Sequence, residues 1–226
     1  MKADTYGPDI DVLGQVSLDF NSGPAKEYRG KRLLDVCLSA ALLPLVAPVV
    51  AVLWLMVRCD GGPGFFSHRR VGVSGAEFAC LKLRSMHPDA ERMLSRHLVN
   101  DADAAREWAL RQKLTDDPRV TRLGAFLRRS SLDELPQLWN VLRGDMSLVG
   151  PRPITRAELA RYGLARGAYL SCRPGVTGLW QVFGRRSASY AERVHFDLHY
   201  SRNASLLGDL WLLILTMGVV FKRTGS

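Results

Sequence analysis

Two adjacent carboxylates, those of Asp133 and Glu134, lie between two groups of arginines in the sequence. Arg119, Arg122, Arg128 and Arg129 precede this acid pair, and Arg143 and Arg152 follow it. An arginine can hold phosphate oxygens through a bidentate pair of hydrogen bonds. A carboxylate can hold Mg²⁺ or can attack phosphorus as a nucleophile. The pattern therefore indicates a site for a phosphorylated substrate and a divalent metal.

The same residues also fit a purely structural interpretation, in which the acid pair stabilises the start of a helix. Residues 131–134 read Ser-Leu-Asp-Glu, which is the pattern of a capping box, and acidic residues favour the first turn of a helix. Pro136 complicates this interpretation, because with Ser131 as N-cap its ring would crowd the preceding turn. The sequence alone leaves both interpretations open.

Two loops rich in proline and glycine carry further arginines. Arg152 lies between two prolines, and Arg173 is followed by Pro174 and Gly175. Proline stiffens a loop, and glycine lets the backbone approach a ligand closely. Such loops suit a diphosphate, although an isolated loop of this kind more often carries solvated arginines. Two of them beside an acid pair favour the functional interpretation.

Other metal or disulfide sites are poorly supported by the sequence. The four cysteines, Cys37, Cys59, Cys80 and Cys172, are scattered, which predicts reduced thiols that face the cytosol. His195 and His199 have the i, i+4 spacing of a zinc pair, but no third ligand of a matching kind accompanies them.

The chain of 226 residues carries a formal net charge of +9. That length allows one domain with a sizeable core. The charge attracts nucleic acid, an anionic membrane surface or phosphate-bearing substrates. The tryptophans do not alternate with basic residues as on a nucleic-acid platform, so we expect no nucleic-acid partner.

An apolar run over residues 33–57 has the length of a bilayer-spanning helix, which needs ~20 residues. Pro44 and Pro48 lie inside this run, and each removes a helical hydrogen bond. Basic residues flank both ends, and positive flanks favour the cytoplasmic side of a membrane. We therefore predict a re-entrant helix over residues 31–58, broken at the prolines; a kinked transmembrane anchor is the alternative.

The remaining pattern predicts an α+β fold that is mainly α. Residues 1–30 are expected to form a disordered cytoplasmic tail, and residues 59–226 the catalytic domain. The expected elements are a hairpin over 65–86, helical regions over 87–113, 124–143 and 190–200, a short strand over 179–182 and a terminal apolar helix over 206–221. The terminal helix either lies at the membrane interface or is buried in the domain.

An ordered set of motifs resembles the bacterial sugar transferases, which are monotopic polyprenyl-phosphate phosphoglycosyl transferases. The matching segments are residues 31–35, the proline-containing apolar run, 82–86, 131–140, 144–147, 150–153, 173–178 and 180–182. Residues 116–121 and the adjoining segments resemble the ExoY group of exopolysaccharide production proteins.

The resemblance implies a monotopic protein of the inner (cytoplasmic) membrane, with re-entrant and interface helices and the catalytic domain in the cytoplasm. It implies that Asp133 attacks the phosphorus that bears the sugar of a UDP-sugar and releases UMP. Undecaprenyl phosphate then takes the phosphosugar, and the ExoY group points to galactose. Glu134 would assist Asp133, and both would hold Mg²⁺.

Further roles follow from the same resemblance. Arg128, Arg152, Arg173, Pro174, Gly175 and Gln181 would bind the substrate phosphates and uridine, and Lys82 and Arg84 would support the membrane face. The implied partners are the UDP-sugar, undecaprenyl phosphate and membrane lipid, and a homodimer is also allowed. The alternative function is a basic scaffold or regulator at the membrane surface, in which the acid pair only caps a helix.

Overall fold

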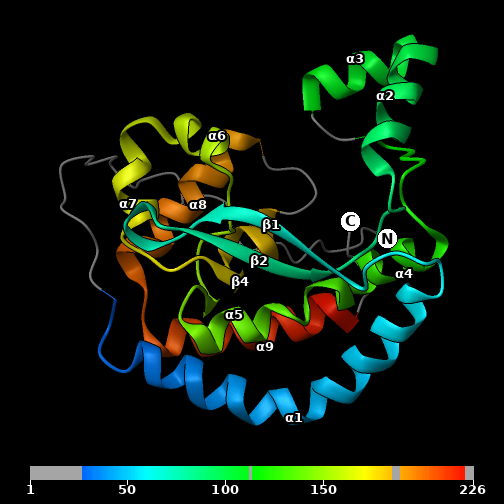
Figure 1. Cartoon of the computed structure of the whole chain (residues 1–226). Coiled ribbons are helices and arrows are strands. Elements are labelled where there is room, and N and C mark those ends of the chain that lie inside the picture. The colour runs from blue at the N-terminus through cyan, green and yellow to red at the C-terminus, as the bar shows by residue number, and fades with distance from the viewer. Residues whose placement is uncertain (1–26, 112–113, 185–188, 222–226) are drawn as a thin grey trace, which may run out of the picture.

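The computed structural model describes residues 27–111, 114–184 and 189–221, so most of the predicted tail lies outside the described residues. The described chain is mainly helical with two small sheets, which confirms the predicted fold class (Figure 1). The helices and strands are α1 (Lys31–Arg58), β1 (Phe65–Val71), β2 (Glu77–Leu83), α2 (Ala90–Asn100), α3 (Ala102–Arg111), α4 (Arg122–Ser130), α5 (Gln137–Arg143), β3 (Ser147–Val149), α6 (Arg156–Leu159), α7 (Arg166–Leu170), β4 (Gly175–Thr177), α8 (Tyr190–Asn203) and α9 (Leu206–Phe221).

Helix α1 forms an arch under the rest of the chain, and both ends of the arch turn toward the same side (Figure 1). Pro44 and Pro48 lie within this continuous helix, so the predicted break is instead a gradual curve. Both prolines are exposed and stand one turn apart. The two missing hydrogen bonds therefore fall on the outer side of the arch, where the helix can open and bend around the body.

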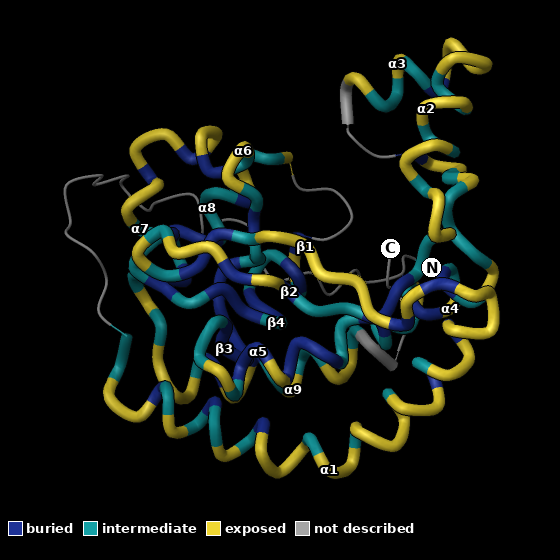
Figure 2. Tube along the Cα trace, in the orientation of Figure 1, coloured by how far each residue is buried: buried dark blue, intermediate teal, exposed yellow. Residues whose placement is uncertain are grey.

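The outer side of α1 is apolar and exposed (Figure 2). Leu33 and Leu45 are 68% and 73% exposed, whereas its buried residues recur about every fourth position on the inner side. Helix α9 likewise exposes Leu207 and Ile214 and buries Leu212. We call the exposed residues of α1 and α9 the apolar face. Helix α1 is long and apolar enough to cross a membrane, and a helix that exposes so much apolar surface needs apolar surroundings.

A buried cluster of charges joins the starts of α1 and α9. The Lys31 ammonium lies 2.6 Å from a carboxylate oxygen of Asp209 and 3.5 Å from one of Asp35. The Tyr200 hydroxyl donates to Asp209, and the Ser147 hydroxyl donates to Asp35. We call these five residues the charge clamp. It ties both apolar helices to β3, because Ser147 begins that strand.

The predicted hairpin is confirmed. Strands β1 and β2 pair antiparallel, from Phe65 opposite Leu83 to Val71 opposite Glu77. Phe78 and Cys80 of β2 are buried in the main core, so β2 is attached to the body while β1 is largely exposed.

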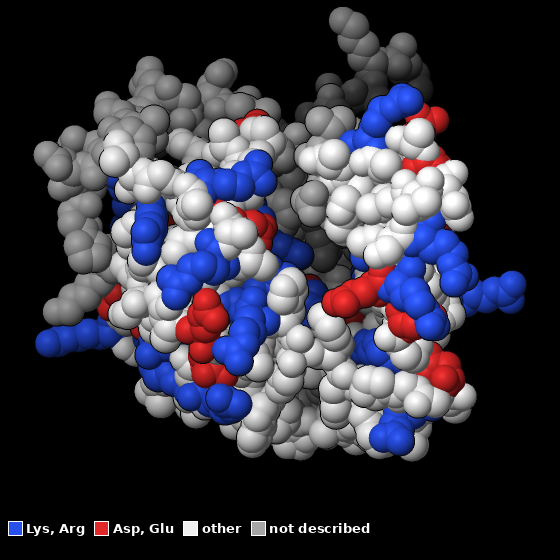
Figure 3. Space-filling model, turned by 45° about the horizontal axis from the view of Figure 1, so that its top comes forward, with Lys and Arg blue, Asp and Glu red and all other residues white. Residues whose placement is uncertain are grey.

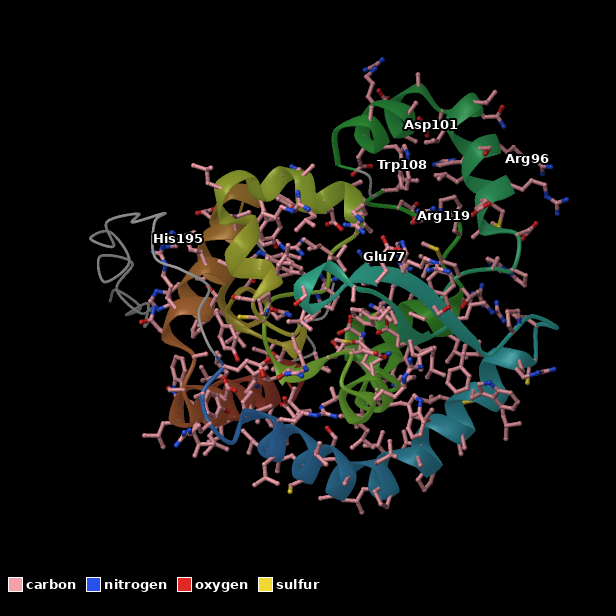
Figure 4. All side chains as sticks on the ribbon, turned by 60° about the vertical axis from the view of Figure 1, so that its left-hand side comes forward. Glu77, Arg96, Asp101, Trp108, Arg119 and His195 are labelled. Carbon is pink, nitrogen blue, oxygen red and sulfur yellow. The ribbon has the colours of Figure 1, made fainter. Side chains whose placement is uncertain are left out.

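Helices α2 and α3 replace the single helical region predicted over 87–113, and the pair projects from the body (Figure 1). The Trp108 ring of α3 faces the Arg119 guanidinium, which lies 4.9 Å from the ring centre (Figure 4). Arg119 also forms an ion pair with Asp117, so these contacts attach the projecting helices to the segment that leads into α4.

The second sheet corrects the predicted strand over 179–182. The strand is β4, which pairs parallel with β3, and residues 180–184 form a turn of π-helix. Apolar residues in so short a run fit a strand or a turn equally well. The strand forms earlier in the sequence because glycines let two backbones cross: the Gly150 N–H donates to Thr177, and the Gly175 N–H donates to Pro151.

Replacing Gly175 with Ala is expected to destabilise the protein by at least about 2 kcal/mol. An added Cβ would lie 2.1 Å from the Gly150 nitrogen and 2.3 Å from the Thr177 oxygen, both backbone atoms that pair the strands. Thermal unfolding of the purified variant measures this loss. Gly167→Ala is the matched control, since nothing lies within 4 Å of its added Cβ; equal melting temperatures for the two variants would contradict the prediction.

Candidate active site

The acid pair lies on a tight turn between α4 and α5. Helix α4 ends at Ser130, and the next residue, Ser131, has a left-handed backbone with a φ of 58°. Residues 132–134 then form one turn of 3₁₀-helix, and Pro136 caps α5. The predicted helix over 124–143 is thus interrupted, because Ser131 reverses the backbone and Pro136 lacks an N–H to continue the ladder.

The capping box predicted for the acid pair does not form, although Asp133 and Glu134 lie in the first turn of a 3₁₀-helix. Ser131 forms no side-chain cap hydrogen bond to the following turn. A capping box requires the N-cap residue in an extended conformation with its side chain bonded to the third residue on. The carboxylates of Asp133 and Glu134 instead lie close to residues of other elements.

Both carboxylates converge on Lys82 of β2. Its ammonium lies 2.6 Å from Glu134 Oε1 and 3.7 Å from Asp133 Oδ2. The Asp133 residue is only 6% exposed. Burial, together with the charge of Glu134, raises the pKa of Asp133, and the charges of Lys82 and Arg128 partly oppose this rise. The result is a buried carboxylate beside two cations, an environment that is frequent at catalytic sites.

Arg128 belongs to this site. Its Nε donates to the Ser85 hydroxyl at 2.8 Å. Burial lowers the pKa of Arg128, and the charge of Asp133 opposes that shift. A guanidinium with donors to spare beside an acid pair can hold a substrate phosphate.

The acid pair suits a divalent cation that is shared with substrate. Two carboxylates already converge on one cation, Lys82. Mg²⁺ is usually held by one or two carboxylates plus substrate phosphates rather than by a cage of protein ligands. Among the described residues, no group of three or more His, Cys, Asp and Glu side chains could hold a metal, and this includes the region of His195 and His199.

The two residues predicted to support the membrane face lie in different surroundings. Lys82 contacts the acid pair. Arg84 is buried and binds Asp60, with further donations to the carbonyls of Val57 and Pro63. Its guanidinium therefore fastens the end of α1 to the start of the hairpin.

Arg173 lies apart from the acid pair. Its guanidinium pairs with Glu27 at 2.6 Å and donates to the Gly144 carbonyl, just after the end of α5. The acid pair precedes the other end of this helix, and seven residues of helix span about 10 Å. Pro174 and Gly175 form the backbone crossing between β3 and β4, so these three residues support the site without joining the acid pair.

Arg152 belongs to a second group of side chains, whereas Gln181 is a buried residue of the π-helical turn. The guanidinium groups of Arg152 and Arg193 lie 5.3 and 5.2 Å from the ring centre of Trp180. Arg70 lies near both arginines. Burial lowers the pKa of Arg70, and the charges of Arg152 and Arg193 lower that pKa further. We call Arg70, Arg152 and Arg193 the arginine cluster. Figure 3 shows basic side chains gathered around a hollow in the surface of the molecule.

The sequence-based predictions missed Arg70, Arg193 and Trp180. They come from β1, α8 and the π-helical turn, which are distant in the sequence. One signal was available for Arg193. Ser189 and Glu192 form a capping box, which predicts that a helix starts just before Arg193. Arg193 lies four residues before Asp197, so the two residues were to be expected on the same face of that helix.

Comparison with known proteins supports a shared architecture. Residues 26–223 match the family model described as bacterial sugar transferase. The chain is 48% identical over 196 residues to the UDP-galactose-lipid carrier transferase of Erwinia amylovora, covering 87% of this chain and 41% of the relative. It is 47% identical over 197 residues to the exopolysaccharide production protein ExoY of Sinorhizobium fredii, covering 87% of each.

The name of a third relative specifies glucose in place of galactose. The chain is 40% identical over 196 residues to the UDP-glucose:undecaprenyl-phosphate glucose-1-phosphate transferase of Caulobacter vibrioides, covering 83% of this chain and 68% of the relative. Against the Erwinia protein and similar proteins of Salmonella typhimurium and Haemophilus influenzae, the chain spans only about two fifths of the relative's length.

Proposed function

Since this chain belongs to the bacterial sugar transferase family, we propose that it transfers a phosphosugar from a UDP-sugar to undecaprenyl phosphate. The observation that carries the proposal is the buried Asp133 beside Glu134, Lys82 and Arg128. The names of relatives support the same donor and acceptor classes. The capping box on which the scaffold alternative relied does not form.

The reaction proceeds as two displacements at one phosphorus. A carboxylate oxygen of Asp133 attacks the phosphorus that bears the sugar, the bond to the UMP oxygen breaks, and UMP leaves. A phosphate oxygen of undecaprenyl phosphate then attacks the same phosphorus and frees the carboxylate. Splitting the transfer in this way means that two bulky substrates never need to react directly with each other.

The neighbours of Asp133 take distinct roles in this scheme. Arg128 and Lys82 stabilise the negative charge that collects on the transferred phosphoryl oxygens. Asp133 and Glu134 would hold Mg²⁺ together with the donor diphosphate, and the bound ion would neutralise that diphosphate. Glu134 keeps Lys82 in place through their contact at 2.6 Å.

The apolar face supports a position of this site at a membrane surface. We propose that the arch of α1 enters the bilayer and returns, so that the protein is monotopic, and that α9 lies at the interface. Arg32 of α1 donates to the carbonyls of Val141 and Leu142 at the end of α5. Helix α5 therefore rests on the arch, and the acid pair at its other end is within reach of a lipid phosphate. The basic flanks suit an anionic cytoplasmic leaflet.

The experiment that tests the proposal is a UMP-release assay. The purified protein in detergent receives undecaprenyl phosphate and, in parallel, UDP-galactose, UDP-glucose and N-acetylated UDP-sugars, with Mg²⁺ or with a chelator. We expect release with UDP-galactose above the other donors, in line with the relatives named for galactose, and loss of release on chelation. No release with any donor from well-folded protein would refute the catalytic proposal.

Replacing Lys82 with Met is expected to shift the acid limb of the kcat/KM profile to higher pH. Asp133 must be ionised to attack phosphorus, and the charge of Lys82 holds its raised pKa down. Without that charge the pKa rises further, so the activity loss is greater at acidic than at alkaline pH. The pH profile of UMP release measures this shift, and Lys82→Arg, which keeps the charge, is the control. A uniform loss across pH in the Met variant would contradict the prediction.

A further inference from the structure

One face of strand β1 is directed toward the body and is nevertheless open to solvent. Strand β2 places Cys80 in the main core, and His68 of β1 lies opposite Cys80. Opposite residues of an antiparallel pair share a face of the sheet, so His68 lies on the core-facing side. The first five residues of β1 are all exposed (Figure 2). The strand therefore overhangs the body, and its inner face stays accessible.

This inner face reaches the acid pair. Phe66 lies opposite Lys82, whose ammonium contacts both Asp133 and Glu134. The Cβ atoms of two opposite residues are about 5 Å apart. His68 follows two residues further along the same face, which is about 7 Å at ~3.4 Å per residue. The ring of Phe66 is 52% exposed, and its centre lies 6.2 Å from that of the His68 ring. Two exposed rings therefore stand beside the acid pair.

A hydrogen bond from Arg70 fixes the form of the His68 ring. The Arg70 guanidinium lies 3.1 Å from His68 Nδ1 and is itself paired with Glu158 at 3.2 Å. A guanidinium can only donate, so Nδ1 is the acceptor and the proton of the neutral ring is on Nε2. Partial burial lowers the pKa of His68, and the charges of Arg70 and Lys82 lower it further against the opposing effect of Glu158. At neutral pH, His68 thus presents one uncharged N–H donor.

The chemistry of these two rings suits a sugar rather than the other parts of the substrates. A phosphate is held by cations, and an apolar prenyl chain has no acceptor for an imidazole N–H. A sugar ring offers both hydroxyl oxygens and C–H groups. In an in-line displacement the attacking and leaving oxygens lie on opposite sides of the phosphorus. The sugar therefore extends to the side of that line, within one ring's length of Asp133, where Phe66 and His68 stand.

Resting on the proposed function, we infer that Phe66 and His68 form the subsite for the sugar of the UDP-sugar. The Phe66 ring packs against a C–H face of the sugar, and His68 Nε2 donates to one of its hydroxyls. In galactose the C4 hydroxyl is axial, so the C–H bonds at C3, C4 and C5 form one continuous apolar patch. In glucose the C–H bond at C4 points to the opposite face and interrupts that patch. An aromatic ring at this position therefore favours galactose.

Kinetics with modified donors test this subsite. UMP release is measured with UDP-galactose, with UDP-glucose and with four donors that lack the galactose hydroxyl at C2, C3, C4 or C6. His68→Leu is expected to lower kcat/KM for UDP-galactose about 10-fold, the effect of leaving a hydroxyl unpaired. One of the four deoxygenated donors, the one without the hydroxyl bonded by His68, should be used equally well by variant and wild type. Phe66→Leu should reduce the preference for galactose over glucose.

The hairpin supplies a matched control. Ser67 is exposed between Phe66 and His68 but lies on the opposite face of the strand, so Ser67→Ala should keep wild-type kinetics with every donor. UMP lacks the sugar, so its inhibition constant, followed through formation of the lipid-linked sugar, should be the same in wild type, Phe66→Leu and His68→Leu. Substitutions at exposed positions change stability little, so all three variants should melt at the wild-type temperature.

Three results would overturn the sugar subsite. The first is a loss in His68→Leu that is equal for UDP-galactose and all four deoxygenated donors. The second is an unchanged preference for galactose in Phe66→Leu. The third is an inhibition constant for UMP that rises as much as the KM for the donor, which would place the nucleotide on these rings. Each result leaves UMP release by the wild-type protein intact, whereas its absence with every donor would refute the proposed function.

Discussion

Asp133→Asn is expected to lower UMP release by at least about 1,000-fold, because the amide cannot form the phosphosugar ester. Asn has the size of Asp and keeps one acceptor oxygen, so the substitution removes the negative charge with little change in shape. A UMP assay on the wild-type and variant proteins, with UDP-galactose and undecaprenyl phosphate, measures the loss. Glu134→Gln is the companion variant, and we expect it to retain more activity, since it removes an assisting group and leaves the nucleophile.

The Asp133→Asn variant should melt at the wild-type temperature or above it. Burial raises the pKa of Asp133, so ionisation of this carboxyl costs the folded protein free energy at neutral pH. A raised folded pKa means that the stabilising contribution is present at low pH and is lost as the pH rises through that pKa. Asn removes the charge and with it the cost. A lower melting temperature for Asp133→Asn would show that the carboxylate supports the fold, and would make its activity loss ambiguous.

Lys31→Met is expected to reduce the free energy of unfolding by about 3–5 kcal/mol, the usual consequence of leaving buried charges unpaired. Asp35 and Asp209 are 1% and 0% exposed, and Lys31 is their shared cation. The tyrosine and serine hydroxyls of the charge clamp cannot replace the lost positive charge. Thermal unfolding in detergent measures the change.

The control for this prediction is an ion pair on the surface. Arg92→Met removes the exposed pair with Asp89 on α2, and exposed pairs contribute about 0–1 kcal/mol. Asp209→Asn in the Lys31→Met background should recover part of the lost stability, because it removes one of the two unpaired charges. Equal melting temperatures for Lys31→Met and Arg92→Met would show that the clamp is not a net source of stability.

The elements that could be predicted from the sequence are those with a strong local pattern. The helix predicted over residues 31–58 has the same bounds as α1, and the alternation around the turn at 72–75 predicted the hairpin. Both patterns depend on neighbours in the chain and on one buried face. The curve of α1 was harder to predict, because two prolines on one exposed side bend a helix without ending it.

The acid pair could be found because its two members are adjacent, and Lys82 was named for another role. The pairing of Lys82 with Glu134 depends on how β2 packs against the turn before α5, which no local pattern encodes. Arg173 illustrates the converse. Its proline and glycine neighbours indicate a constrained loop, and the constraint serves the backbone crossing with Gly150. The arginine cluster was missed for the same reason, since its members meet only in the folded chain.

The contacts around Asp209 join the two ends of the described chain, which are made at different times during synthesis. Tyr28, beside the start of α1, donates to Asp209, which lies 181 positions later in the chain. Helix α1 therefore emerges from the ribosome long before its partner α9 exists, with Lys31 still without its closer partner Asp209. An apolar helix in that state is prone to aggregate or to cross the bilayer outright. The contacts between the start of α1 and α9 can therefore form only after the last helix has been synthesised.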